Sequence, residues 1–166
     1  MDFKALYDTL TELPNWTLFQ ERLRHSMAVA KRNNTQHACV FVELDGPRPA
    51  SDDLDRNSLL KAVANRLKPT KREVDTLARV SNNLFALLLE NVSDTTQLDL
   101  IVKRISGVLS TPFEIKGQEI IIEPNIFGGI CTGACVAAEN PKNADIKQCY
   151  ECVRSNKIPV NSKAIL

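Results

Sequence analysis

Two close pairs of cysteines are the residues of this 166-residue chain whose spacing first suggests chemistry. They are Cys131-x3-Cys135 and Cys149-x2-Cys152. Zn²⁺ accepts four thiolates arranged in two pairs, so a zinc-binding interaction domain is one interpretation. The second pair falls on a segment with helical periodicity, however, and free cysteine packs as a small buried hydrophobe. We therefore favour core packing and do not expect zinc.

The two histidines do not indicate a catalytic site. His25 and His37 flank the first helical segment and the loop that follows it. No nucleophile stands at a spacing that would pair with either ring, so neither predicts acid–base catalysis. We expect both histidines at the surface.

The bulk composition predicts an ordinary globular domain. Hydrophobic residues make up 43% and charged residues 25%, and the formal net charge is +1. This balance gives no field that would draw the chain to nucleic acid or an anionic membrane. No apolar run approaches the ~20 residues that span a bilayer, and the N-terminus does not read as a signal peptide. An odd number of cysteines, five, then favours reduced thiols. We expect a cytoplasmic protein, or a cytoplasmic piece of a longer one.

The elements that must position any site follow from hydrophobic periodicity. Helical spacing predicts helices over about 15–31, 59–67, 94–109 and 143–154. Apolar runs predict strands over 38–45, 75–80, 84–90, 112–116 and 118–130. Strands interleaved with helices in this order predict an α/β (α+β) fold, with a mostly antiparallel central sheet flanked by helices.

Two local signals refine this outline. Ser81-Asn82-Asn83 separates two strands, and asparagine tolerates a positive φ, so we expect a tight hairpin there. Asp94 has the features of a helix N-cap, with Gln97 as its reciprocal partner.

Several stretches, taken in order, resemble the motifs of the GGDEF family, the diguanylate cyclase fold. Asp8 to Asn15 resembles the opening D-x-L-T-G-L-P-N, and Val42 to Gly46 resembles the strand that carries D-x-D. Leu59 to Leu67 resembles the pattern L-L-x-x-V-A-x-R-L, and Arg72 to Val80 resembles the pattern R-x-x-D-x-x-A-R-x. Pro112-Phe113 with Ile120 to Gly128 resembles the late P-F hairpin. Together they cover nearly the whole chain. The resemblance implies a GGDEF/nucleotidyl cyclase-like fold.

The resemblance also implies an activity, the joining of two GTP molecules into cyclic di-GMP with Mg²⁺ held by carboxylates. Where the letters G-G-D-E-F should stand, this chain has Ser81, Asn82, Asn83, Leu84 and Phe85, and only Phe85 matches. The family's third and fourth letters supply negative charge, whereas Asn83 and Leu84 are neutral. The first acid of D-x-D is Glu43, so Mg²⁺ is expected only if Glu43 retains it. The alternative is a weakly active cyclase, which would need Glu90 or Asp45 as a substitute ligand.

Other family contacts are altered as well. The resemblance places Arg48 at the lysine of the family's F-K after D-x-D, so a cation remains there, and Asn57 at a guanine-reading aspartate. Near the C-terminus it leaves Lys157 as the retained cation. These three residues are the expected remnants of a nucleotide site.

Arg72-x2-Asp75 matches the family's inhibitory site, where cyclic di-GMP is held away from the active centre. An arginine fork suits a phosphate or a guanine edge. A local ion pair at the start of a strand is the plainer interpretation.

We therefore expect a single GGDEF-like domain over 15–160, after a lead-in and opening motif over 1–14 and before a tail over 161–166. The expected role is regulatory and non-enzymatic, with no cofactor. The expected partners are cyclic di-GMP or GTP, a neighbouring sensor or EAL-type domain, and a second copy of the domain.

Overall fold

The computed structural model describes residues 3–44 and 53–131. A four-stranded sheet forms its centre, in the order β2-β3-β1-β6, and all neighbouring strands are antiparallel. The strands are β1 (His37–Glu43), β2 (Thr76–Ser81), β3 (Leu84–Leu89) and β6 (Asn125–Cys131). A separate two-stranded hairpin consists of β4 (Phe113–Ile115) and β5 (Gln118–Ile120). The predicted fold class is confirmed.

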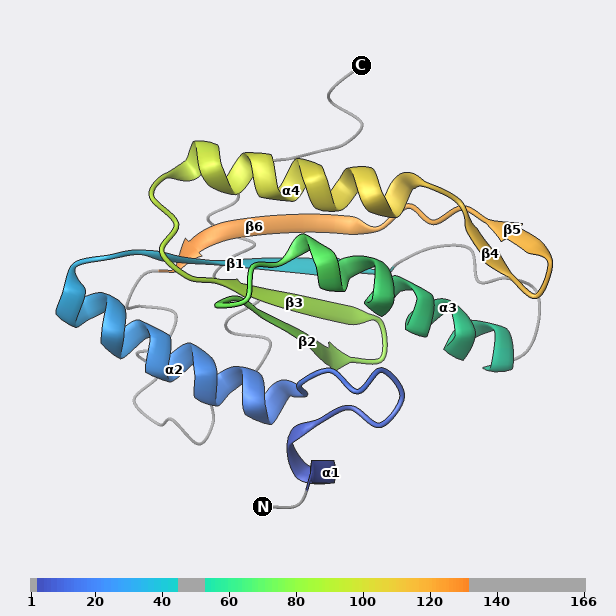
Figure 1. Ribbon diagram of the computed structural model, residues 1–166, viewed down its shortest axis with the longest axis horizontal. Coiled ribbons are helices and arrows are strands. Elements are labelled where there is room, and N and C mark those ends of the chain that lie inside the picture. Colours follow the sequence, from blue (N-terminus) through green and yellow to red (C-terminus); the bar gives the residue numbers. More distant parts are fainter. Residues whose placement is uncertain (1–2, 45–52, 132–166) are drawn as a thin grey trace.

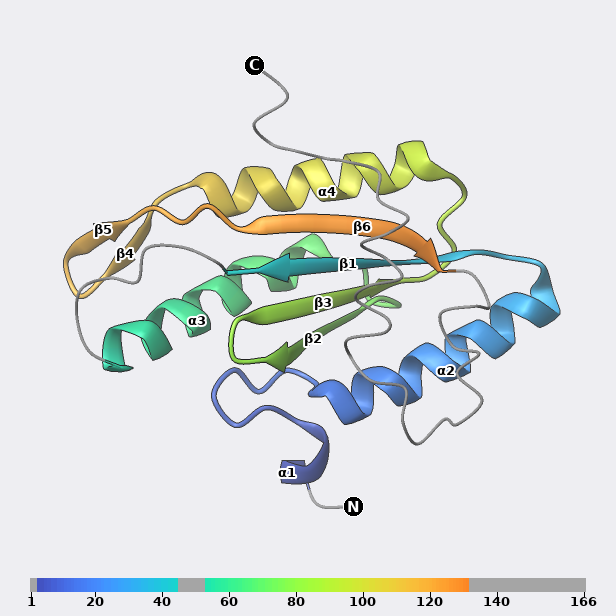
Figure 2. The same ribbon diagram turned by 180° about the vertical axis from the view of Figure 1, so that it is seen from behind.

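Helices cover both faces of the sheet (Figures 1 and 2). The helices are α1 (Phe3–Leu6), α2 (Trp16–Asn33), α3 (Asp53–Leu67), α4 (Thr95–Ser110) and the 3-10 turn η1 (Lys68–Thr70). α3 and α4 pack on one face, while α2 packs on the other.

The alternating side chains of β1 show how one sequence serves both faces. Val40 and Val42 belong to the hydrophobic core under α3 and α4, whereas Cys39 and Phe41 belong to the core under α2. Successive side chains of a strand point to opposite faces, so a strand covered on both sides reads as a continuous apolar run. This is why the 38–45 run could be recognised as a central strand.

The ends of the helices follow local chemistry. The Asn15 side chain accepts a hydrogen bond from Leu18 N at the start of α2, and Asp94 does the same for Gln97 N at the start of α4. The expected return bond from Gln97 to Asp94 is wrong. The side-chain oxygen Oε1 of Gln97 accepts instead from the backbone N–H and the hydroxyl of Ser93.

Two strand predictions need correction. The run 118–130 is two strands, β5 and β6, because β5 pairs with β4 while β6 pairs with β1, and Pro124 between them has no N–H to donate to a ladder. The β2–β3 hairpin exists, but neither Asn82 nor Asn83 has a positive φ. The strands instead shift register between Arg79 and Ser81. Such a bulge supplies the local twist that the turn needs.

The predicted helix over 143–154 and the tail after 160 lie outside the described residues.

Candidate functional site

The turn Ser81-Asn82-Asn83-Leu84 lies against the C-terminal end of β1. In the ladder between β1 and β3, Glu43 is paired with Leu84. The next residue, Leu44, donates its backbone N–H to the carbonyl oxygen of Asn83 at 2.8 Å. Backbone pairing therefore brings Glu43 and the turn together, as the resemblance to a cyclase site requires.

The side chains of the turn do not supply a metal site. Ser81 and Asn82 are exposed, and Asn83 is partly buried. Leu84 is buried in the core under α2, and Phe85 in the core under α3 and α4. The turn therefore presents hydroxyl and amide groups to solvent and no carboxylate.

The family chemistry implies bound Mg²⁺ at this place. Mg²⁺ prefers hard oxygen ligands in near-octahedral geometry, and carboxylates usually anchor it. Among the described residues, Glu43 is the carboxylate that backbone pairing places beside the turn, while the Asp8 carboxylate is bonded to Arg79. Residues 3–44 and 53–131 contain no group of three or more His, Cys, Asp or Glu residues arranged to hold a metal. The described residues do not fit a catalytic pair of magnesium ions.

Glu90 cannot replace the missing acids. It follows β3 at the end remote from the turn, and a six-residue strand spans roughly 17–20 Å. Its carboxylate accepts a hydrogen bond from the Ser26 hydroxyl on α2. The other proposed substitute, Asp45, lies outside the described residues.

Of the three expected nucleotide remnants, Asn57 lies in the described part of the chain. Asn57 lies on α3 and is exposed. Arg48 and Lys157 lie outside the described residues, so their positions relative to the turn stay predictions.

Arg72 and Asp75 form a compact, strongly bonded unit. Arg72 Nε and Nη2 each donate to one Asp75 oxygen at 3.0 Å. The backbone N–H groups of Arg72 and Glu90 also donate to this carboxylate, at 2.9 and 3.1 Å. The Asp75 side chain is 2% exposed, whereas that of Arg72 is 44% exposed. The aspartate is thus fully used within the fold, and only the arginine faces solvent.

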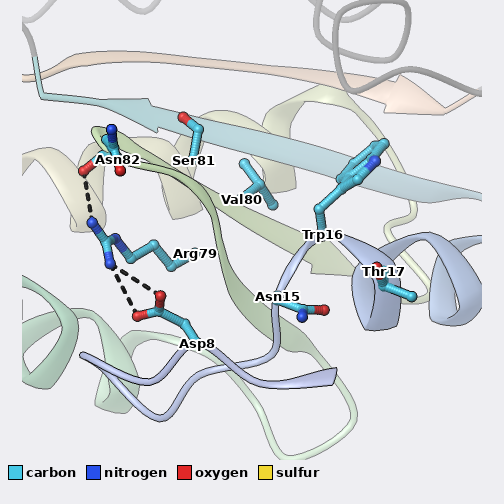
Figure 3. Close-up of a pocket in the computed structure, with 8 residues that line it drawn as sticks. All are labelled: Asp8, Asn15, Trp16, Thr17, Arg79, Val80, Ser81 and Asn82. Atoms are coloured by element: carbon cyan, nitrogen blue, oxygen red, sulfur yellow. Dashed lines mark hydrogen bonds and ion pairs between the residues drawn. The ribbon is translucent and has the colours of Figure 1, made fainter. Parts of the chain in front are cut away.

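A second ion pair, which sequence reasoning did not identify, joins the opening motif to the turn (Figure 3). Arg79 Nη1 lies 3.0 Å from Asp8 Oδ1, and Arg79 Nη2 donates to the carbonyl oxygen of Asn82 at 3.1 Å. The backbone N–H of Arg79 also bonds the carbonyl oxygen of Pro14 at 3.0 Å. The only sequence signal was the presence of both residues in family-like motifs, because 71 positions separate them.

These residues line a pocket of about 260 Å³, together with the start of α2. Its lining residues are Asp8, Asn15, Trp16, Thr17, Arg79, Val80, Ser81 and Asn82. Asp8 and Arg79 neutralise each other at 3.0 Å, so the pocket offers no uncompensated cation for a triphosphate. The pocket lies where the Asp8–Arg79 ion pair, called the joint below, connects the opening motif to the β2–β3 hairpin.

The local environment shifts the Asp8 carboxyl group. Burial opposes its ionisation, but hydrogen bonds from the Thr11 hydroxyl (2.6 Å) and backbone N–H (2.9 Å), together with Arg79, outweigh that cost. The net effect holds the pKa of Asp8 below its ordinary value.

The histidine prediction is half wrong. His25 is exposed on α2, but His37 is 2% exposed, and its Nε2 contacts the carbonyl oxygen of Ser26. α2 covers the start of β1, so the first residue of that strand is enclosed along with the apolar residues after it.

One of the four paired cysteines is described. Cys131 is buried at the end of β6, where its thiol contacts Cys39, in keeping with core packing. Cys135, Cys149 and Cys152 lie outside the described residues.

Comparisons with known proteins agree with this fold and with the motif order. The family model "Diguanylate cyclase, GGDEF domain" matches residues 5–156. The bifunctional diguanylate cyclase/cyclic di-GMP phosphodiesterase MucR of Pseudomonas aeruginosa is 34% identical over 128 residues, which cover 74% of this chain and 18% of MucR. The chain therefore belongs to the GGDEF family, and it spans under a fifth of the length of this relative.

Solved structures show the same fold. The isolated GGDEF domain of TpbB from P. aeruginosa superimposes with a TM-score of 0.73 at 24% identity, covering 91% of this chain and 90% of that one. The GGDEF domain of DgcB from Caulobacter crescentus, solved with c-di-GMP, gives a TM-score of 0.66 at 17% identity, covering 80% and 81%. Among residues 3–44 and 53–131, no helix is both long and apolar enough to cross a membrane.

The joint between Asp8 and Arg79 gives a pH-dependent prediction. Asp8→Asn should lower the free energy of unfolding by about 1–2 kcal/mol near neutral pH, because it removes a charge-assisted pair. The folded pKa of Asp8 lies below its unfolded value. The ionised carboxylate therefore stabilises the fold above the ordinary pKa of about 3.9, and this contribution is lost as the pH falls through the folded pKa.

Urea unfolding at several pH values checks this. The difference between wild type and Asp8→Asn should be steady above about pH 5 and shrink toward zero in more acidic buffer. Asp99→Asn is the matched control, because Asp99 pairs with Lys103 at 2.9 Å on the surface of α4 and should contribute no more than about 0.5 kcal/mol. A loss in Asp8→Asn that does not change with pH would contradict the assignment.

Proposed function

We propose that this chain is a catalytically inactive GGDEF domain that serves cyclic di-GMP signalling as a regulatory module. It would act as a scaffold, as a dimerisation unit or as a nucleotide sensor. The observation that carries the proposal is the neutral turn beside Glu43, where cyclase chemistry needs at least two further negative charges.

The reaction of an active family member explains why charge decides the matter. A 3′-hydroxyl of one GTP attacks the α-phosphate of another and pyrophosphate leaves, and two such steps give cyclic di-GMP and two pyrophosphates. Negative charge concentrates on phosphate oxygens in each transition state, and metal ions neutralise it. A metal beside a triphosphate must itself be anchored by carboxylates, and the Asn83 amide and the buried Leu84 side chain cannot do this.

The neutral turn also fills space that the reaction needs. Glycine lacks a Cβ and lets a backbone approach a phosphate closely. Ser81 and Asn82 carry side chains that project from the turn into solvent. We infer that they obstruct the approach of a nucleotide even though the hairpin itself is kept.

The surroundings of the domain are proposed from the relatives. MucR is described as both a diguanylate cyclase and a cyclic di-GMP phosphodiesterase, and this chain matches 18% of its length. We propose that the chain works beside a sensor domain or an EAL-type phosphodiesterase domain of the same protein, in the cytoplasm and as a homodimer. The regulatory effect would arise because the neighbouring domain binds the nucleotide-bound form of this domain with a different affinity from the nucleotide-free form.

A product assay tests inactivity directly. The chain is incubated with GTP and either Mg²⁺ or Mn²⁺, and cyclic di-GMP is quantified by chromatography beside an intact GGDEF domain as positive control. We expect no product above the protein-free blank. Cyclic di-GMP formation that disappears in Glu43→Gln would show an active cyclase and refute the proposal.

Nucleotide sensing is supported by the half-exposed Arg72. Asp75 holds the guanidinium through Nε and Nη2, and Nη2 also donates to the carbonyl oxygen of Glu90. Among residues 3–44 and 53–131, no group accepts a hydrogen bond from Nη1. A bound cyclic di-GMP would thus contact the outer edge of Arg72 and leave Asp75 in its internal role. Arginine binds phosphate and guanine oxygens with a planar fork that lysine lacks.

Calorimetric titration with cyclic di-GMP tests this role. Arg72→Lys should weaken binding about 10-fold or more, because the charge remains while the fork is lost. Arg104→Lys, on the exposed side of α4, is the matched control and should leave affinity unchanged. Equal affinity of wild type and Arg72→Lys would remove Arg72 from the site, while absence of binding to wild type would leave the inert scaffold as the remaining role.

A further inference from the structure

Two thiols lie in contact across the central sheet. Cys39 is on β1 and Cys131 ends β6, and their Sγ atoms are 3.1 Å apart. The antiparallel register pairs His37 with Cys131 and Cys39 with Gly129. The two cysteines are therefore diagonal neighbours, two residues offset, with side chains on the same face.

The surrounding core holds this pair in place. Both cysteines belong to the hydrophobic cluster under α2. Next to them on the same face of the same two strands, Phe41 and Phe127 stack with ring centroids 5.6 Å apart. β1 and β6 share a seven-residue ladder, which holds the backbones of the two cysteines beside each other.

We propose that Cys39 and Cys131 are an oxidation site at which a hydroperoxide forms an intramolecular disulfide. Both residues are thiols in this structure. The proposal goes beyond the regulatory role above and does not depend on it.

The chemistry balances in two steps. A peroxide oxidises the Cys131 thiol to a sulfenic acid and is itself reduced, hydrogen peroxide giving one water. The Cys39 sulfur then attacks the Cys131 sulfur, the S–S bond forms, and the hydroxyl leaves with the Cys39 proton as a second water. Cys131 is assigned the first step because it is 6% exposed, whereas Cys39 on β1, between β3 and β6, is 0% exposed.

The position of the pair predicts its consequence. The pair lies at the end of the ladder where β1 begins and β6 ends, while Glu43 and the turn lie at the other end of β1. A disulfide here would join β6 to β1 and close a long loop of chain, which removes entropy from the unfolded state. We expect the oxidised chain to be more stable, with the hairpin unchanged.

The experiment isolates the pair from the other cysteines. In a variant with Cys135→Ser, Cys149→Ser and Cys152→Ser, hydrogen peroxide should cause a mass loss of about 2 Da and the disappearance of both thiols, reversed by a thiol reductant. Tryptic peptides containing Cys39 and Cys131 should be cross-linked. The melting temperature of the oxidised form should rise by about 5 °C or more.

A second variant that also carries Cys131→Ser is the control and should neither lose 2 Da nor gain stability. Three results would overturn the proposal. The first is a mass gain of about 16 or 32 Da without cross-linking, and the second is a disulfide between two chains. The third is that both thiols of the folded variant stay unmodified under peroxide conditions that oxidise the same variant unfolded in urea. Wild-type protein, oxidised and digested in the same way, then shows whether the bond forms with all five cysteines present.

Discussion

The structure depends on a backbone ladder that fixes the end of β1 against the β2–β3 turn. Glu43 is paired with Leu84, and Leu44 bonds the carbonyl oxygen of Asn83. These contacts involve main-chain groups, which every non-proline residue carries. The shape of the hairpin beside Glu43 can therefore persist when the turn carries neutral residues. Fold and chemistry are separable here, because the fold needs the hydrogen bonds of the turn and the chemistry needs its charges.

Three charged motif residues in the described part of the chain, Asp8, Asp75 and Arg79, are bonded within the fold. Asp8 and Arg79 connect the opening motif to the turn, and Asp75 binds Arg72 and two backbone N–H groups. The acidic letters of the turn, by contrast, would face a metal rather than another part of the protein. A domain that works as a scaffold or sensor needs the first group and can lose the second. Membership of the GGDEF family and the proposed lack of activity are thus compatible.

Local sequence patterns predicted the local features well. The continuous apolar run of β1, the amphipathic α4 with its Asp94 cap and the position of the hairpin were all recognisable, because each depends on neighbours within a few residues. The misses involve strand pairing. The division of 118–130 into β5 and β6, the enclosure of His37 and the contact of Cys39 with Cys131 depend on which strands lie side by side, and spacing along one sequence does not encode that. The pairing of Asp8 with Arg79 was hidden for the same reason.

We expect that the turn beside Glu43 anchors no catalytic metal. Electron paramagnetic resonance of Mn²⁺ titrated with a nonhydrolysable GTP analogue tests it most directly, since Mn²⁺ occupies the oxygen-rich sites that Mg²⁺ prefers. The account predicts that adding the chain leaves the Mn²⁺–nucleotide spectrum as it is in buffer. An intact GGDEF domain in the same titration should alter it. Two protein-bound Mn²⁺ ions per chain that are lost in Glu43→Gln would contradict the account.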